Sequence, residues 1–149
     1  MAQTMSERQR GAEAMSEIFV DTSGIFAALD ADDANHASAA AWFDELLEDG
    51  TTLVVTSYVL AEAAALVQRR LGVDAARRLL LDHASVFDIA WVDEDLHSRG
   101  VDAWLAAGRR SLSLVDCVSF ALMHELHLDT VFTLDRHFAE QGFRVVPEA

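Results

Sequence analysis

Two acidic residues of this 149-residue chain follow short apolar runs that are typical of buried strands. Asp21 comes directly after residues 18–20, and Asp135 comes directly after residues 131–134. A carboxylate at such a place lies at the carboxyl edge of a sheet, where open α/β sheets bind their ligands. An aspartate there also caps the next helix well, so capping remains an alternative role for both residues.

A third acid, Glu62, lies one turn into a predicted helix over residues 58–71. We expect its face of the helix to point into the core, because its neighbours three and four residues away are Tyr58, Val59, Ala65 and Leu66. A buried carboxylate needs a partner or a metal ion, since burying an unpaired charge is costly. A salt bridge to an arginine is the structural alternative.

The fourth acid, Asp116, interrupts a helical run, residues 113–127, that is otherwise apolar nearly all round. A helix of that composition is predicted to be buried, and helix propensity does not call for an aspartate within it. Asp116 lies near the helix start, where a negative charge favours the helix dipole, but Ser113 is the better cap. A functional role and a role at the helix end both stay open.

The four acids together predict a cation site. If they converge on one rim of a sheet, their like charges repel one another, and the cluster becomes stable when hard cations enter. Mg²⁺ and Mn²⁺ prefer carboxylate and water oxygens as ligands. Such a site polarises a phosphodiester and lowers the pKa of a bound water, so the predicted chemistry is phosphodiester hydrolysis.

Short apolar segments alternate with longer amphipathic ones along the chain, which predicts the elements that must position these acids. Strands are predicted at residues 18–20, 51–57, 86–92, 130–134 and 143–146. Helices are predicted at residues 25–31, 36–49, 58–71, 73–84, 93–108, 113–127 and 135–140. This order favours an α/β fold, a three-layer α/β/α sandwich with a mainly parallel central sheet. We expect Asn35 to cap the second helix and Trp91 and Trp104 to pack in the core.

Composition restricts the function further. The chain has 11 arginines, no lysine, and 25 Asp plus Glu, a formal net charge of −14, so a polyanionic substrate needs metal ions as intermediaries. The missing lysine excludes Schiff-base, phosphate-loop and kinase chemistry. One cysteine, Cys117, and no membrane or signal segment favour a cytoplasmic protein with no membrane partner. We expect a single domain over residues 18–149 after a loose tail, residues 1–17.

Four segments in this order, with familiar spacing, resemble the PIN-domain nucleases and, within them, the VapC-like toxins of bacterial type II toxin–antitoxin pairs. The segments are FVDTSGIFAALD, TSYVLAEAAALVQRR, LSLVDCVSFALMHE and VFTLDRHFAEQGFRVVP, and the resemblance covers roughly residues 18–147.

The resemblance implies an endoribonuclease that uses Mg²⁺ or Mn²⁺, is blocked by a cognate antitoxin, and forms a homodimer. It implies a set of metal-binding acids, which are Asp21, Glu62, Asp116 and Asp135. It also places hydroxyl groups near the metal site, and the candidates in this sequence are Thr22, Ser23, Ser113 and Thr133.

Two arginines and one histidine could also lie near the acids. Arg109 and Arg110 could guide an RNA backbone toward the acids, or they are simply solvated charges at a helix end. His137 could approach the site because it follows Asp135 by two residues.

One rival function is that of a phosphatase or phosphotransferase with Asp21 as nucleophile, which the serine at position 23 and the missing lysine disfavour. The other rival is a non-catalytic PIN-like binding module.

Overall fold

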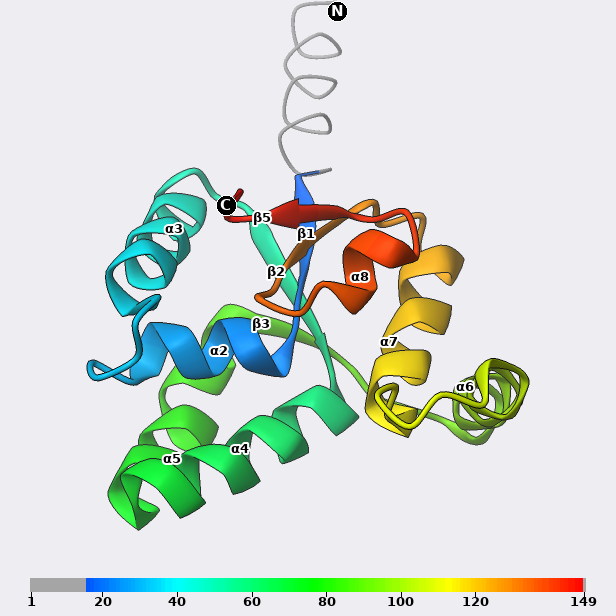
Figure 1. Cartoon of the computed structure of the whole chain (residues 1–149). Helices are drawn as coiled ribbons and strands as arrows, with labels where there is room; N and C mark the ends of the chain where they lie inside the picture. The colour runs from blue at the N-terminus through cyan, green and yellow to red at the C-terminus, as the bar shows by residue number, and fades with distance from the viewer. Residues whose placement is uncertain (1–15, 149) are drawn as a thin grey trace, which may run out of the picture.

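The computed structural model describes residues 16–148, and five parallel strands form one sheet in the order β3-β2-β1-β4-β5 (Figure 1). The strands are β1 (Glu17–Val20), β2 (Thr52–Thr56), β3 (Phe87–Ala90), β4 (Thr130–Phe132) and β5 (Arg144–Val146). The helices are α2 (Thr22–Leu29), α3 (His36–Glu48), α4 (Ser57–Leu71), α5 (Val73–Leu81), α6 (Glu94–Ala107), α7 (Leu114–Glu125) and α8 (His137–Glu140), with a short 3₁₀ helix, η1 (His83–Val86).

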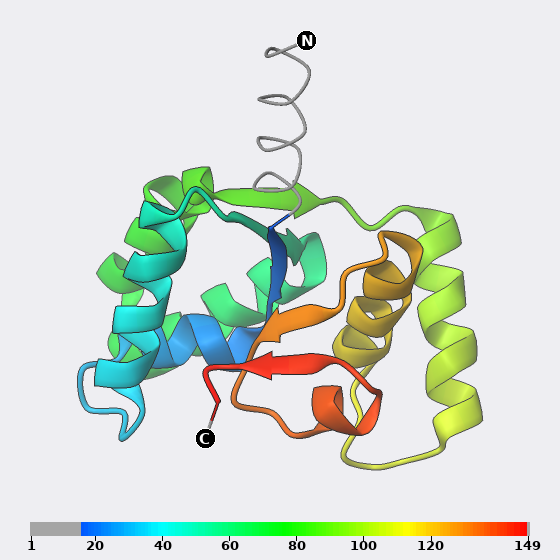
Figure 2. The same cartoon turned by 90° about the horizontal axis from the view of Figure 1, so that it is seen from above.

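Helices cover both faces of the sheet. Helices α2 to α5 pack on one face, and α6, α7 and α8 pack on the other, as the views in Figures 1 and 2 both show. The chain passes from β1 through β2 to β3 in one direction along the sheet, and β4 and β5 then extend the sheet on the other side of β1. Because crossovers between parallel strands are right-handed, the helices of these two halves lie on opposite faces. The prediction of a three-layer α/β/α sandwich with a parallel sheet is confirmed.

The core forms where the strands meet the apolar faces of these helices. Phe19, Val55 and Phe132 from three strands have no exposed surface, and Phe138 of α8 is equally buried. Burial of side chains of this size contributes about 1.5–3 kcal/mol each relative to exposure. Trp91 and Trp104, which the sequence assigns to the core, are 75% and 45% exposed, so that expectation is wrong. Trp91 lies past the end of β3, and Trp104 lies on the solvent side of α6.

Every predicted strand and helix has a counterpart in the structure, with shifted ends. The side chain of Thr56 accepts a 2.9 Å hydrogen bond from the Val59 amide and so caps α4. Asn35 stands at the N-cap position of α3 without a side-chain capping bond, so its predicted capping role is wrong. Helix α5 ends at Leu81, and the residues after it form the 3₁₀ turn η1 rather than more α-helix.

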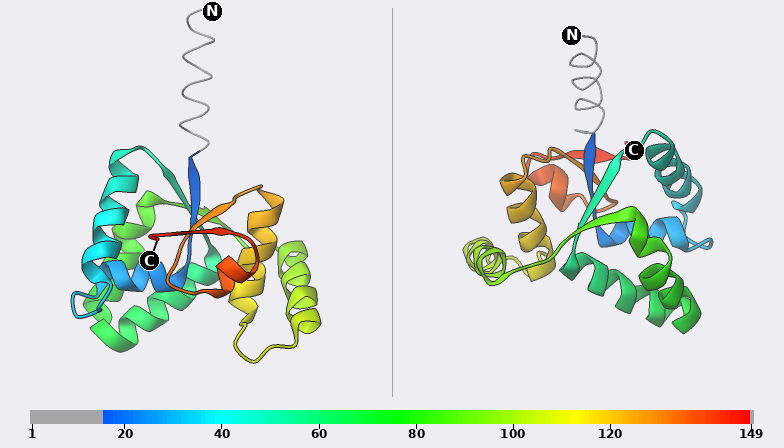
Figure 3. Two further views of the ribbon diagram at one scale, coloured as in Figure 1. Left: turned by 45° about the horizontal axis from the view of Figure 1, so that its top comes forward. Right: turned by 180° about the vertical axis from the view of Figure 1, so that it is seen from behind.

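The strand order reverses between β1 and β4, which makes this pair the topological switch point of the sheet (Figure 3). Val20 pairs with Phe132 at the ends of the two strands, and the Asp21 amide donates a 3.1 Å hydrogen bond to the Phe132 carbonyl. Gly24 in the first turn of α2 lies against this edge, because a Cβ there would be 2.3 Å from the Phe132 ring. Ligands of open parallel sheets bind at this kind of edge.

Two expectations concern the ends of the chain and the membrane. Residues 1–15 of the predicted tail lie outside the described residues, and Glu17 begins β1. Within residues 16–148, none of the helices combines the length and the apolar character that a bilayer-crossing helix requires.

Candidate metal centre

Asp21 directly follows β1 at the switch point and is 4% exposed. It occupies the N-cap position of α2, yet its side chain makes no capping bond. Its Oδ2 atom instead accepts hydrogen bonds from the hydroxyls of Ser23, at 3.2 Å, and Thr133, at 3.1 Å. Capping therefore does not explain this aspartate, and the two hydroxyls hold its carboxylate in one orientation.

The surroundings of Asp21 disfavour its negative charge. Burial, and next the charge of Asp116, raise the pKa of Asp21 from 3.8 to about 6, although hydrogen bonds from the Thr22 backbone and the Thr133 side chain lower it. The charge of Asp135 adds to the rise. Buried like charges of this kind become favourable when a cation neutralises them.

Asp116 lies in the first turn of α7 and takes part in its cap. Its Oδ2 atom accepts a 3.0 Å hydrogen bond from the Ser113 amide, and its own amide donates a 3.1 Å bond to the Ser113 hydroxyl. Burial raises the pKa of Asp116, the bond from the Ser113 backbone lowers it, and the charge of Asp135 raises it further. The cap therefore holds Oδ2 of Asp116 in place, whereas the other carboxylate oxygen of Asp116 accepts no hydrogen bond from residues 16–148.

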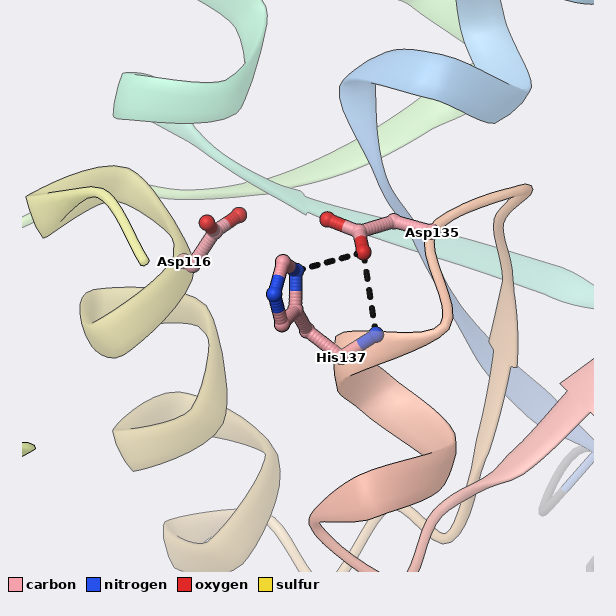
Figure 4. A group of neighbouring side chains, drawn as sticks. All are labelled: Asp116, Asp135 and His137. Carbon is pink, nitrogen blue, oxygen red and sulfur yellow. Dashed lines mark hydrogen bonds and ion pairs between the residues drawn. The ribbon is translucent and has the colours of Figure 1, made fainter. Parts of the chain in front are cut away.

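Asp135 lies in the turn between β4 and α8. Arg136, rather than Asp135, holds the N-cap position of α8, but the Oδ1 atom of Asp135 accepts a 2.9 Å bond from the His137 amide. The Asp135 amide in turn donates to the Thr133 hydroxyl at 2.9 Å. The imidazole Nδ1 of His137 lies 2.7 Å from the same Oδ1 atom, as Figure 4 shows.

Asp116, Asp135 and His137 form one group. They offer ligand atoms that all lie within 4.8 Å of one another, and Figure 4 shows the two carboxylates turned toward each other with the imidazole edge beside them. Asp21 joins this group through its charge interactions with both aspartates and through the Thr133 hydroxyl. Carboxylate oxygens in this number suit a hard divalent cation, so the residues present fit the Mg²⁺ or Mn²⁺ that the sequence predicts.

The predicted hydroxyl residues have separate places. Ser23 and Thr133 contact each other at 2.9 Å, and the Ser23 hydroxyl also accepts a 3.0 Å bond from the Leu134 amide, so they tie the ends of β1 and β4 together. Ser113 orients Asp116, as described above. The Thr22 hydroxyl is buried and has no hydrogen-bond partner among residues 16–148.

Glu62 does not lie where the sequence predicts. Helix α4 buries the face that carries Val59, Ala63 and Val67, whereas Glu62 is exposed. The expectation that Glu62 faces the core is therefore wrong, and so is the argument that burial forces it to find a partner. Tyr58 of the supposed core face is only half-buried, with its hydroxyl 2.7 Å from the imidazole of His97.

The two predicted RNA-binding arginines lie in the loop between α6 and α7. Arg109 forms a 3.0 Å ion pair with Glu140 of α8, and both residues are exposed. Arg110 is exposed and forms no ion pair with any residue from 16 to 148. The ion pair holds this loop against α8, which begins beside Asp135.

An open cleft of about 620 Å³ lies beside Asp135. Asp135 and Thr133 line it together with Asn35, Arg136 and Glu148. The cleft therefore gives solvent access to the half-buried Asp135.

Sequence reasoning named His137 only by its closeness to Asp135, and it missed Ser111. The Nε2 atom of His137 lies 3.2 Å from the Ser111 hydroxyl, which comes from the loop between α6 and α7. No sequence pattern signals this contact, because the two residues are 26 positions apart and the packing of the loop before α7 against the start of α8 decides it.

Comparison with known proteins supports the fold and the family. The PIN domain family matches residues 18–144. The 23S rRNA-specific endonuclease VapC20 of Mycobacterium tuberculosis is 33% identical over 134 residues, which cover 88% of this chain and 99% of the relative. Ribonuclease VapC26 of the same organism is 31% identical over 130 residues, covering 82% of this chain and 90% of the relative.

Solved structures agree with these matches. The crystal structure of Mycobacterium tuberculosis VapC20, described as a sarcin–ricin loop cleaving toxin, superposes with a TM-score of 0.75 at 30% identity, covering 85% of this chain and 95% of that one. FitAcB from Neisseria gonorrhoeae shares the fold, with a TM-score of 0.61 at 22% identity, covering 86% and 95% of the two chains.

Proposed function

This chain belongs to the PIN domain family, and from that premise we propose that it is a metal-dependent endoribonuclease and the toxin of a type II toxin–antitoxin pair. The observation that carries the proposal is the approach of Asp116, Asp135 and His137 beside the switch point of the sheet, with Asp21 coupled to both aspartates by charge. These neighbouring like charges are unfavourable for a metal-free protein, since Asp116 and Asp135 raise the pKa of Asp21 and Asp135 raises that of Asp116, and they are favourable for a protein that binds a divalent cation.

A bound Mg²⁺ or Mn²⁺ supplies Lewis-acid polarisation of a phosphodiester and lowers the pKa of its bound water. The chain holds the carboxylates in place for this chemistry. Ser113 fixes one oxygen of Asp116, and Ser23 and Thr133 fix Asp21. We assign the metal-binding role to the acids and the orienting role to these hydroxyls.

Glu62 stays in the proposal as a fourth, outer acid. Helix α4 begins beside the first turn of α7, which carries Asp116 (Figure 1). Because Glu62 is exposed, its long side chain is free to turn toward a cation, and its removal costs the fold little. We expect Glu62→Gln to reduce cleavage by less than Asp116→Asn does, and a steady-state comparison of the two variants measures this.

RNA is the proposed substrate, and ribosomal RNA is the first one to assay, because VapC20 is a 23S rRNA-specific endonuclease. Exposed Arg110 and the cleft lined by Arg136 are the proposed contacts for the RNA backbone, with Arg109 available once it leaves Glu140. Arg110→Glu should weaken RNA binding and reduce its dependence on salt concentration, since it removes a phosphate contact.

A basic antitoxin and a second copy of the chain are the proposed protein partners. The net charge of −14 favours a positively charged partner. The homodimer follows from the resemblance to the VapC-like toxins. Sedimentation of the purified chain, alone and after coexpression with the protein encoded beside it, tests both partners.

The test of the proposed function is cleavage of purified ribosomal RNA by the chain stripped of any bound protein. We expect cleavage with Mg²⁺ or Mn²⁺, none with EDTA, and a loss of about 100-fold or more in Asp116→Asn. The matched control is Asp88→Asn, the same change at an exposed strand residue, which should cleave normally. Equal cleavage by both variants would place the activity elsewhere.

Two further measurements, trapping of a phosphoenzyme and cation binding, separate the rival functions. A phosphoryl group trapped on Asp21 would favour the phosphatase, although the side chain is nearly fully buried and the chain has no lysine. Cation binding without cleavage of any RNA would favour a non-catalytic binding module.

A further inference from the structure

We propose that His137 is itself a ligand of the cation, so that the centre combines one imidazole nitrogen with the carboxylates of Asp116 and Asp135. The inference rests on the function proposed above, because it adds a residue to the same centre. It also assigns Ser111 as a positioning residue that acts through His137.

The imidazole is held from its outer side. Its Nε2 atom lies 3.2 Å from the Ser111 hydroxyl. Histidines that bind metals with one ring nitrogen commonly donate the other N–H to a neighbouring acceptor, which fixes the tautomer and the ring orientation. With the proton on Nε2 donated to Ser111, the Nδ1 atom presents a lone pair.

The inner side of the ring lacks a hydrogen bond. Nδ1 is buried and lies 2.7 Å from Oδ1 of Asp135, but that contact lacks the direction of a hydrogen bond, and Nδ1 has no other partner among residues 16–148. A buried nitrogen without a partner is costly. In the tautomer with its proton on Nε2, the Nδ1 lone pair so close to a carboxylate oxygen is repulsive, and a cation bound to both atoms removes both problems.

The spacing of the group agrees with a single ion. Ligand atoms about 2.1 Å from an octahedral ion are about 3 Å apart when adjacent and about 4.2 Å apart when opposite. The Nδ1 to Oδ1 distance is 2.7 Å, and the ligand atoms of Asp116, Asp135 and His137 all lie within 4.8 Å of one another. A pair of ligand atoms 4.8 Å apart would have to close by about 0.6 Å to occupy opposite positions on one ion.

Two contacts hold the loop between α6 and α7 against α8 and so support the ring. One is the contact between Ser111 and His137, and the other is the 3.0 Å ion pair between Arg109 and Glu140. The loop also leads directly into Ser113 and Asp116, so the same segment places the imidazole and one of the carboxylates.

A nitrogen ligand changes which ions the centre prefers. Mg²⁺ strongly favours oxygen, whereas imidazole suits transition ions, whose affinity for mixed nitrogen and oxygen sites rises from Mn²⁺ to Co²⁺. We therefore expect His137→Gln, which replaces the nitrogen with an amide oxygen, to lower the affinity for Co²⁺ by about tenfold or more and that for Mg²⁺ by less.

The direct test is pulsed electron paramagnetic resonance of the full chain with one equivalent of Mn²⁺. We expect ¹⁴N coupling from a bound imidazole in the wild type, and its loss in His137→Gln while Mn²⁺ remains bound. The matched control is His124→Gln on the exposed side of α7, which should keep the coupling. Ser111→Ala should keep it too, but bind Mn²⁺ about tenfold more weakly.

The outcomes separate this inference from the proposed function. Bound Mn²⁺ without ¹⁴N coupling, or coupling that survives in His137→Gln, would show that His137 only pairs with Asp135, and the inference would be wrong while the cation centre stood. Failure of the wild type to bind Mn²⁺, or binding unchanged in Asp116→Asn, would overturn the centre and the proposed function together.

Discussion

Replacing Asp21 with asparagine should stabilise the metal-free protein at neutral pH. Asp21 is 4% exposed, and burial together with the charge of Asp116 raises its pKa to about 6. The metal-free fold therefore carries an unfavourable charge once Asp21 ionises. Asparagine has nearly the same shape and keeps an oxygen for the hydroxyls of Ser23 and Thr133, so it removes the charge and retains the hydrogen bonds.

The size of this effect follows from the difference between the pKa of Asp21 in the folded chain and its pKa in the unfolded chain. Folded Asp21 holds its proton up to pH about 6, whereas the unfolded chain releases it near 3.8. The favourable contribution of the neutral side chain is complete below the unfolded pKa and is lost as pH rises through the folded pKa. At 1.36 kcal/mol per pKa unit, the loss reaches about 3 kcal/mol at pH 7.5 and stays under about 1 kcal/mol at pH 4.

Urea unfolding in EDTA at pH 4 and pH 7.5 measures this effect as the difference between Asp21→Asn and the wild type. The variant should be more stable by up to about 3 kcal/mol at pH 7.5 and by under about 1 kcal/mol at pH 4. Asp88→Asn, at an exposed position of β3, should show no such trend. A wild type more stable than Asp21→Asn at pH 7.5, or a difference independent of pH, would refute the reasoning.

Four further predictions concern the fold and the centre. Gly24→Ala should destabilise by about 1–3 kcal/mol in urea unfolding, because its Cβ would be 2.3 Å from the Phe132 ring. Ser113→Ala should cost about 1 kcal/mol through the lost cap of α7, and calorimetry should also find weaker Mn²⁺ binding, because the cap partner is Asp116. Phe138→Ala should cost about 3–5 kcal/mol, since the ring is fully buried. Mg²⁺ at 100 times its Kd should stabilise the wild type by about 2.7 kcal/mol in thermal unfolding and leave Asp116→Asn unchanged.

Each of these predictions has a clear contrary result. Wild-type stability of Gly24→Ala or Phe138→Ala would mean that the packing at the switch edge is looser than described. Unchanged Mn²⁺ affinity in Ser113→Ala would separate the cap from the centre. Equal stabilisation of wild type and Asp116→Asn by Mg²⁺ would place the cation at another site.

Much of the fold could be predicted because its signals are local. Apolar strands bounded by turn residues, and helices with an apolar stripe, give the element order, and parallel strands joined by helices give the layers. Asp21 and Asp135 could be selected as candidates because each follows an apolar run typical of a strand, and Asp116 could be selected because it interrupts an apolar helix. These three acids needed no knowledge of tertiary contacts.

The errors occurred where tertiary packing decides the outcome. Helix α4 carries apolar residues on more than one face, and the sequence around Glu62 does not say which face is buried. In the structure, the buried face is the one that carries Val59 and Val67. Trp91 is apolar but lies past the end of an edge strand, where nothing requires burial. The contact of Ser111 with His137 depends on a loop conformation that no periodicity encodes.

The most direct test of the cation centre is an anomalous difference map from crystals of the full chain grown with Mn²⁺. We expect a strong peak between Asp116 and Asp135, close to His137 and on the side of Asp21, and no such peak in crystals of Asp116→Asn. A map whose strongest protein-bound peak lies away from these acids, or an unchanged peak in the variant, would contradict it.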